Sequence, residues 1–257
     1  MVAFAGGDPE VGERLAGLAG CAACHTADDG EPYAGGYAIV TDYGTFYGSN
    51  LTPHPEHGLG QWTFDDFHRA MRRGKAPDGR PYAPAFPYDQ FTGLTDADLE
   101  HLWAWLQSRP AVERPDRLHD VKRRARSRFW LGWWRRLYFD RGPFEADAAL
   151  TEVEARGAYL GEAVGHCGGC HTPRNRNGAR RTGRALEGSD AEPEPAPALV
   201  GLGWGLDDWQ WFLQTGTTDE GDVVGGEMWR IVEHGTATLP EADQEALAAW
   251  LLVVTRD

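Results

Sequence analysis

The chain of 257 residues contains only four cysteines and three methionines, and it lacks long apolar runs. Its longest apolar stretches fall far short of the roughly 20 residues that a membrane-spanning helix requires, so no such helix is expected. Basic residues are also in deficit, and the formal net charge of −14 argues against nucleic acid as a partner, because phosphate backbones require a concentrated basic face. No signal-peptide pattern precedes Phe4, so export would require a targeting segment that has been removed.

All four cysteines fall in two copies of one five-residue pattern. The copies are CAACH at residues 21–25 and CGGCH at residues 167–171. Two thiols three positions apart on one helical turn reach the two vinyl groups at one edge of a porphyrin, and the adjoining histidine then lies below the iron. The pattern therefore predicts two covalently attached haem c groups. The thioether cysteines are Cys21, Cys24, Cys167 and Cys170, and the proximal iron ligands are His25 and His171.

Three other uses of these cysteines are conceivable: disulfides, a redox pair and a zinc site. A redox Cys-x-x-Cys pair of the thioredoxin type needs a neighbouring βαβ pattern, which this sequence lacks. Zinc does not explain why histidine follows the second cysteine directly in both copies. Haem attachment accounts for every cysteine and both histidines.

The chain also repeats itself at a shift of about 145 residues, which indicates two related halves. Residues 12–26 parallel residues 157–172, and residues 58–74 parallel residues 201–216. Each half shows a first helix that leads into the cysteines, a middle helix, and a last helix with apolar residues at helical spacing. We predict domains at 8–108 and 150–257, with residues 109–149 between them. Strand signals are weak, so the expected class is all-α.

A six-coordinate haem of this kind usually takes a methionine sulfur as its second axial ligand, from the loop before the last helix. In the second half Met228 is the only methionine, and it lies midway between Gly216 and Pro240. Met228 is therefore the predicted sixth ligand of the second iron. The alternative is an ordinary methionine that fills a gap in the core.

The first half has no methionine at the corresponding position, which is occupied by Phe86. Phenylalanine cannot bind iron. The remaining candidate ligands are Met71, His54, His57, His68 and Lys75, each of which also has an ordinary packing or surface role. The first haem is thus predicted to be unusual, with either a ligand other than methionine or an open position.

Several strings resemble the cytochrome c subunits of bacterial membrane-associated dehydrogenases, such as those that oxidise alcohols and sugar acids. These strings are GTFYGSNLTP at 44–53, GLGQW at 58–62, DGRPYAPAFPY at 78–88, RGAYL at 156–160 and GHCGGCHTPRN at 165–175. The resemblance covers nearly the whole chain. Similar proteins carry the ligand methionine at the position of Phe86 or of Leu94, and this chain has it at neither.

The resemblance implies two tandem class I cytochrome c domains and a periplasmic or otherwise extracytoplasmic protein. Electrons would come from a partner dehydrogenase and pass to a quinone, an oxidase or a small carrier of the respiratory chain. The chain itself would be an electron-transfer protein or subunit rather than an enzyme. The alternatives are a haem enzyme, such as a peroxidase or small-substrate oxidoreductase, and a gas-binding sensor, either of which would use the first haem.

Residues 109–149 interleave basic and aromatic residues, with RRARSR at 123–128 and FWLGWWRR at 129–136. Such segments occur at membrane surfaces and on nucleic acids. We favour a different interpretation, in which the aromatic residues pack between the domains while the arginines pair with carboxylates or haem propionates. Arg174, just past the second motif, is expected to contact a propionate in the same way.

Overall fold

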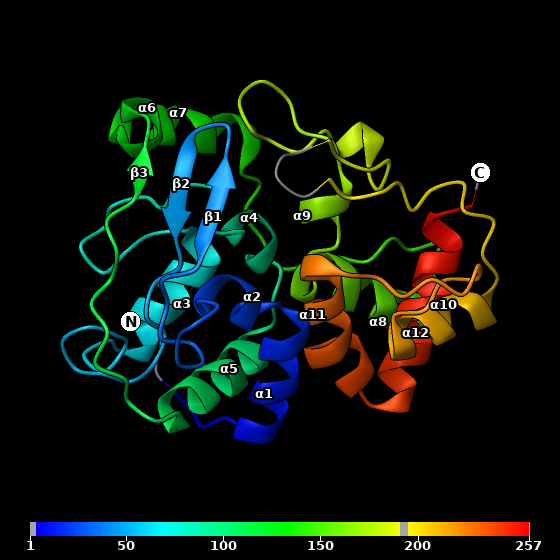
Figure 1. Cartoon of the computed structure of the whole chain (residues 1–257), viewed down its shortest axis with the longest axis horizontal. Coiled ribbons are helices and arrows are strands. Elements are labelled where there is room, and N and C mark those ends of the chain that lie inside the picture. Colours follow the sequence, from blue (N-terminus) through cyan, green and yellow to red (C-terminus); the bar gives the residue numbers. More distant parts are fainter. Residues whose placement is uncertain (1–3, 191–194, 257) are drawn as a thin grey trace. The chain divides into compact units, whose positions relative to one another are not determined.

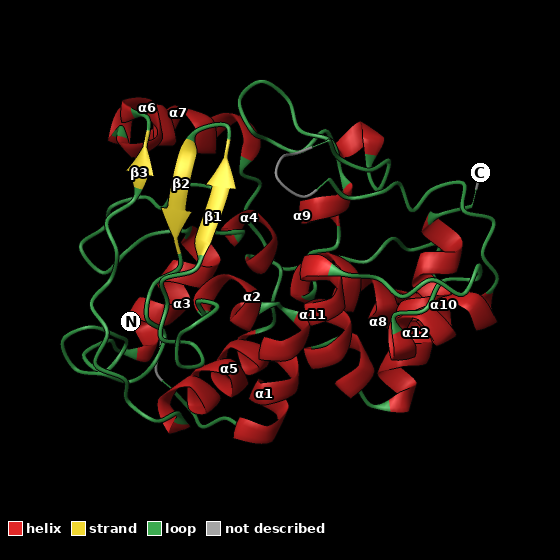
Figure 2. Ribbon diagram, viewed as in Figure 1, coloured by secondary structure: helices red, strands yellow, loops and turns green. Residues whose placement is uncertain are grey.

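The computed structural model describes residues 4–190 and 195–256 (Figure 1). The chain divides into two compact units. The first unit contains the chain up to Ala16 together with Cys21–Pro143, and the second contains Gly17–Gly20 and the chain from Phe144 onward. The described residues are helix-rich with few strands, as predicted (Figure 2). No helix within 4–190 or 195–256 combines the length and the apolarity needed to cross a membrane.

The first unit contains seven α-helices among its described residues. They are α1 (Pro9–Leu18), α2 (Cys21–His25), α3 (Phe64–Arg73), α4 (Tyr88–Phe91), α5 (Asp96–Ser108), α6 (Arg123–Arg126) and α7 (Arg128–Tyr138). The starts of α3 and α5 have a local cause, because the hydroxyls of Thr63 and Thr95 accept the main-chain N–H of Asp66 and Asp98. Gly74 ends α3 with φ of 51°, in the left-handed region that glycine adopts at low cost.

The second unit has a first helix, a motif helix, a middle helix and a last helix in the same order as the first, and its described residues include no counterpart of α6 and α7. Its elements are α8 (Glu152–Ala158), the π-helix η1 (Tyr159–Val164), α9 (Gly168–His171), the 3₁₀ turn η2 (Thr182–Arg184), α10 (Leu206–Thr215), α11 (Gly226–His234), the 3₁₀ turn η3 (Thr236–Thr238) and α12 (Glu241–Val254). Gly216 ends α10 as Gly74 ends α3, with φ of 68°. The middle helix of each unit therefore ends in the same way.

Corresponding glycines let the first and last helices of each unit cross closely. A Cβ atom on Gly12 of α1 would lie 2.1 Å from the main-chain oxygen of His101 in α5. A Cβ atom on Gly157 of α8 would lie 1.9 Å from the main-chain oxygen of Ala246 in α12. Both distances are shorter than any real contact, so only glycine fits at either crossing.

The π-helix η1 has a cause in the sequence. Nine positions separate Gly12 from Cys21, whereas ten separate Gly157 from Cys167. A single extra residue in a helix is accommodated as one wider turn of the π type. The N–H of Gly165 accordingly bonds the oxygen of Leu160, five residues earlier. The crossing glycine and the cysteines thereby keep their relation despite the insertion.

A small antiparallel sheet in the first unit departs from the expected all-α class. It has the order β1 (Ala38–Thr41), β2 (Gly44–Tyr47), β3 (Asp120–Val121). Strands β1 and β2 form a hairpin, and Phe46 on β2 packs in a small core with Val121 and Ala125. The third strand comes from a distant part of the chain, so no local pattern predicts it.

Residues 109–143, most of the predicted connecting segment, belong to the first unit. Helix α7 buries Leu131 and Trp134, and the ring of Trp134 lies 6.4 Å from that of Tyr88. Trp130 similarly packs on Tyr43, with ring centroids 5.6 Å apart. These aromatic residues therefore extend the core of the first unit, and the linker role of residues 109–149 stays a prediction.

Candidate functional site

The first motif forms α2, which places both of its thiols on one short helix. Cys21 and Cys24 are partly exposed. The chain returns past this helix at Gly48, where a Cβ atom would lie 1.8 Å from the main-chain oxygen of Cys24. Glycine is therefore required at position 48, and it brings residues 48–50 directly alongside the motif.

His25 is fixed by two hydrogen bonds to this returning chain and its neighbour. Its Nδ1 donates to the main-chain oxygen of Ser49 over 2.7 Å. Its own main-chain oxygen accepts the N–H of Gly35, also over 2.7 Å. A carbonyl only accepts, so the proton is on Nδ1 and the lone pair is on Nε2. Burial lowers the pKa of His25, against the opposing effect of the Ser49 bond, and keeps the ring neutral.

A buried polar network holds the Ser49 carbonyl in place. Asn50 and Thr52 are almost fully buried. The side-chain amide of Asn50 donates to the main-chain oxygens of Val112 and Arg114, and its main-chain N–H donates to the Asp116 carboxylate. Its Oδ1 accepts the N–H and the hydroxyl of Thr52. This network ties the loop beside His25 to the segment after α5.

The second motif repeats the arrangement on α9. His171 donates from Nδ1 to the main-chain oxygen of Pro197 over 2.8 Å, and its main-chain oxygen accepts the N–H of Gly188 over 2.8 Å. The adjoining Thr172 accepts the N–H of Leu186 through its hydroxyl. Burial lowers the pKa of His171, against the effect of the Pro197 bond. Both motif histidines are thus neutral, with Nε2 as the lone-pair nitrogen.

The four cysteines form no disulfide in the structure, whose described ranges include all of them. Burial raises the pKa of Cys21 to about 12, and burial with the nearby Cys170 raises that of Cys167 to about 12. A redox Cys-x-x-Cys pair or a zinc site needs thiolates, which a raised pKa disfavours. No group of three or more His, Cys, Asp or Glu side chains suited to a metal ion occurs among residues 4–190 and 195–256. Thiols available for thioether bonds, beside a neutral imidazole, fit haem attachment better.

Met228 lies in the first turn of α11, between α10 and α12. The order of elements is as predicted, although the expected loop contains a nine-residue helix. The side chain is half-buried, whereas a methionine that only fills a core is usually enclosed. Its role as a ligand stays a prediction.

The candidate ligands of the first half lie in three places: Met71 and His68 in α3, His54 and His57 in the loop before it, and Lys75 just after it. Phe86 packs against Tyr82 and Phe91, with ring centroids 5.5 and 5.8 Å away. The others differ in surroundings: Met71 is buried in α3, His54 is stacked on His57 at 5.2 Å, and Lys75 is exposed. His54 also uses Nδ1 to accept two main-chain N–H groups. The position that holds methionine in similar proteins thus has an aromatic environment here.

The side chain of Arg174 contacts main-chain atoms in and after the second motif. Its guanidinium donates to the oxygens of Gly169 and Gly178, over 2.8 and 2.9 Å. It therefore braces the chain around α9, and its expected contact with a propionate stays a prediction. The carbonyls of Ser49 and Pro197 and the Asn50 network are not predicted by the sequence, although residues 49–52 lie within one of the strings that carry the resemblance.

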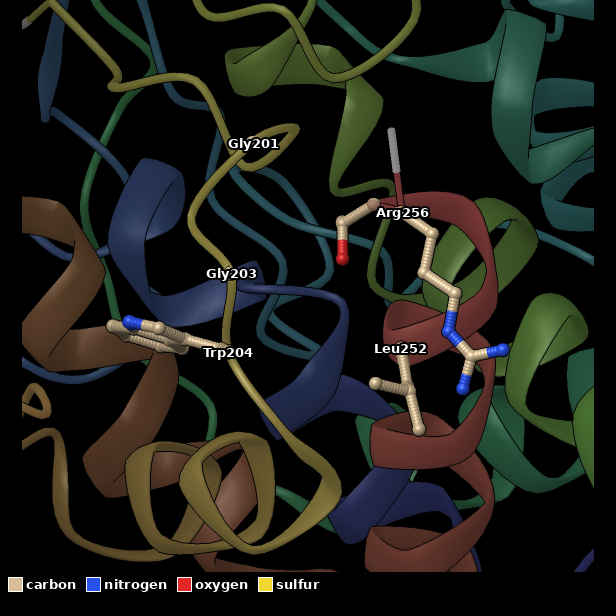
Figure 3. Close-up of a pocket in the computed structure, with 6 residues that line it drawn as sticks. Gly201, Gly203, Trp204, Leu252 and Arg256 are labelled. Atoms are coloured by element: carbon tan, nitrogen blue, oxygen red, sulfur yellow. The ribbon is translucent and has the colours of Figure 1, made fainter.

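A shallow hollow of about 330 Å³ lies in the second unit (Figure 3). The loop at Gly201, Gly203 and Trp204 lines one side, and Leu252, Thr255 and Arg256 at the end of α12 line the other. Among the described residues, no cysteine, histidine or methionine lines it. The hollow therefore takes no part in the sites described above.

Comparison with known proteins agrees with this geometry. Residues 10–110 match the family described as cytochrome c. The chain is 38% identical to a diheme cytochrome c-type protein of Cereibacter sphaeroides over 96% of this chain and 87% of that protein. It is 38% identical to a subunit of nicotinate dehydrogenase from Pseudomonas putida over 94% of this chain. It is also 36% identical to the cytochrome c subunit of the quinone alcohol dehydrogenase of Gluconobacter oxydans over 93% of this chain.

The chain spans 21% of the nicotinate dehydrogenase subunit and 53% of the alcohol dehydrogenase subunit. The diheme protein, in contrast, is covered over most of its length. The Cys-x-x-Cys-His helices, the neutral histidines and these similarities lead to one assignment: the chain belongs to the cytochrome c family.

Proposed function

We propose that this protein carries two haem c groups, one on each motif, and transfers electrons from a dehydrogenase to a respiratory acceptor outside the cytoplasm. The observation that carries the proposal is the pair of hydrogen bonds His25–Ser49 and His171–Pro197, of 2.7 and 2.8 Å. A hydrogen bond from Nδ1 to a carbonyl orients a ligating imidazole and raises its basicity. The same arrangement in two sequence-related units supports a haem in each.

The chain would hold each haem through its own residues. Cys21 with Cys24, and Cys167 with Cys170, supply sulfurs for thioether bonds, while His25 and His171 supply Nε2. When bound, the haem supplies a one-electron couple at iron. The protein sets the potential through the second axial ligand, the hydrogen bond behind the histidine and the degree of burial.

We further propose Met228 as the second axial ligand in the second unit. The methionine lies between α10 and α12, and its half-buried side chain remains accessible to a bound group. Methionine ligation raises the potential relative to a second histidine. With Phe86 at the corresponding position, the first unit would have a different ligand set. Unequal ligation separates the two potentials, and about 59 mV corresponds to a factor of ten in equilibrium.

The names of the relatives support the partner class. They include cytochrome c subunits of an alcohol dehydrogenase, a gluconate 2-dehydrogenase and a fructose dehydrogenase. We propose a dehydrogenase as the electron donor and an oxidase, a quinone or a small carrier as the acceptor. Haem c attachment also fits a periplasmic location, and the same similarities do not support a haem enzyme or a gas sensor.

The experiment that tests this function is expression in a host with cytochrome c maturation, followed by intact-mass measurement. Two haem masses above the bare polypeptide are expected. Replacing both cysteines of the first motif with alanine should leave one haem, and so should the same change in the second. A mass equal to the polypeptide would contradict the proposal. Rapid formation of a ferrous carbon monoxide complex would instead favour an enzyme or a sensor.

A further inference from the structure

Helix α7 has a second apolar face, which is exposed on the surface of the first unit. Leu131 and Trp134 point into the first unit and are buried. Phe129, Trp133 and Leu137 are 86, 41 and 54% exposed. Residues four positions apart lie on one side of a helix, so these three side chains form a continuous exposed row. We call Phe129, Trp133 and Leu137 the apolar row.

The apolar row is held in place because the helix is anchored from its other side. The Arg135 guanidinium donates to the main-chain oxygens of Arg73 and Gly74 at the end of α3. It also lies over the rings of Tyr88 and Phe139, 4.9 and 4.7 Å from their centroids. The exposure is therefore a property of a fixed helix rather than of a frayed end.

Basic residues flank the apolar row along the chain. Between Val121 and Phe139 the chain has no acidic residue and seven basic ones. Six of the seven are exposed: Lys122, Arg123, Arg124, Arg126, Arg128 and Arg136.

Nearby carboxylates do not neutralise this charge. Asp42 and Asp120 lie on the adjoining hairpin and strand, and Asp78 lies near enough to Arg128 to feel its charge. Asp78 is already paired with Arg80. Asp140, which follows α7, adjoins Arg141. The six exposed cations still outnumber Asp42, Asp78, Asp120 and Asp140, which leaves a local positive surface on a chain whose net charge is −14.

We propose that α6 and α7 dock the protein on a membrane surface rich in anionic lipids. The apolar row would enter the boundary between head groups and acyl chains, and the surrounding arginines would contact lipid phosphates. An amphipathic helix with aromatic residues on one side and basic residues beside them is suited to that boundary. At 11 residues α7 is far too short to span a bilayer.

The arrangement favours lipid over a protein groove as the occupant. Helices α6 and α7 lie at the outer edge of the first unit, beyond the ends of the strands (Figure 1). A helix that is packed on the first unit by one side and exposes apolar residues and cations on the other suits a broad anionic surface. This inference does not depend on the haem ligands or on the identity of the electron donor.

The test uses the full haem-loaded chain and co-sedimentation with lipid vesicles. Binding is expected to vesicles that contain phosphatidylglycerol, to weaken with salt, and to be small for pure phosphatidylcholine. The triple variant Phe129→Ser, Trp133→Ser, Leu137→Ser should lower partitioning by about tenfold or more. A charge variant, Arg123→Gln, Arg126→Gln, Arg136→Gln, should remove the preference for phosphatidylglycerol.

The matched control is Trp211→Ser with Val223→Ser, which removes two exposed apolar side chains of the second unit. It should leave vesicle binding unchanged. Circular dichroism and the haem spectrum show whether each variant is folded. Absence of binding by the unchanged protein, or equal binding by the folded triple variant, would overturn the proposal. So would loss of self-association, or of binding to a purified dehydrogenase, in that variant while vesicle binding persists.

Discussion

The imidazole of His171 donates through Nδ1 to the main-chain oxygen of Pro197 over 2.8 Å, and His25 donates to Ser49 in the same way in the other unit. The residues that accept these hydrogen bonds, Ser49 and Pro197, are of different types. What the two units share is a carbonyl presented by a loop that follows the motif. Each carbonyl orients an iron-ligand candidate, so its placement affects the chemistry of the site.

Asn50→Ala is expected to perturb the first unit alone. The change removes the amide that donates to Val112 and Arg114 and the oxygen that accepts from Thr52. Buried groups left without partners cost about 1–3 kcal/mol each, so we expect the unit to lose about 3 kcal/mol of unfolding free energy. Denaturant unfolding and a redox titration measure the outcome. Asn175→Ala is the control in the second unit. Equal shifts of both haem potentials in the Asn50 variant would contradict the assignment of the Asn50 network to the first unit.

Gly157→Ala should strongly destabilise the second unit. The added methyl would meet the main-chain oxygen of Ala246, so α8 and α12 would have to separate. Overpacking of this kind costs about 3 kcal/mol. Gly132→Ala in α7 is the control, because the added methyl would meet no described atom within 4 Å beyond its chain neighbours and the nearby backbone of its own helix, and it should stabilise by about 0.5–1 kcal/mol. Thermal unfolding of both variants tests this prediction. An unchanged melting temperature for Gly157→Ala would contradict the close crossing of α8 and α12.

We expect the first unit to become less stable in mild acid, because His119 then takes up a proton. Its Nδ1 accepts the N–H of Tyr47 over 3.1 Å, which requires a neutral ring, and burial lowers its pKa. The unfolded chain therefore binds a proton more readily than the folded one. This stability is fully present above the unfolded pKa of about 6.5 and is lost as the pH falls through the lower folded value. Urea unfolding at several pH values should show that the unfolding free energy of His119→Gln depends less on pH than that of the unchanged protein. An identical pH dependence in both proteins would contradict this role of His119.

Met228→Ala should lower the higher of the two potentials by about 59 mV or more, a tenfold change in equilibrium. The weak sulfur-to-iron absorption band of the oxidised protein should vanish with it. Ile231→Val, in the same helix, is the control, since it costs only about 0.5–1.5 kcal/mol and removes no sulfur. Persistence of the band in the Met228 variant would remove Met228 from the site.

The haem motifs, the two-fold repeat and the principal helices follow from the sequence alone, because each depends on residues close together in the chain. Two thiols and a histidine within five residues predict an attachment site wherever the helix is placed. Capping by Thr63 and Thr95 and termination at Gly74 and Gly216 are equally local. The helix-rich fold and membership of the cytochrome c family were therefore accessible before the structure.

Only the tertiary structure identified which atoms stand behind the motif histidines. Ser49 and Pro197 act through main-chain oxygens, and every residue has one, so no residue type signals the role. Strand β3 and the two faces of α7 likewise depend on contacts between segments far apart in the chain. Sequence spacing determines what a helix can carry, whereas the packing of distant segments decides which of its faces is buried and which is left exposed.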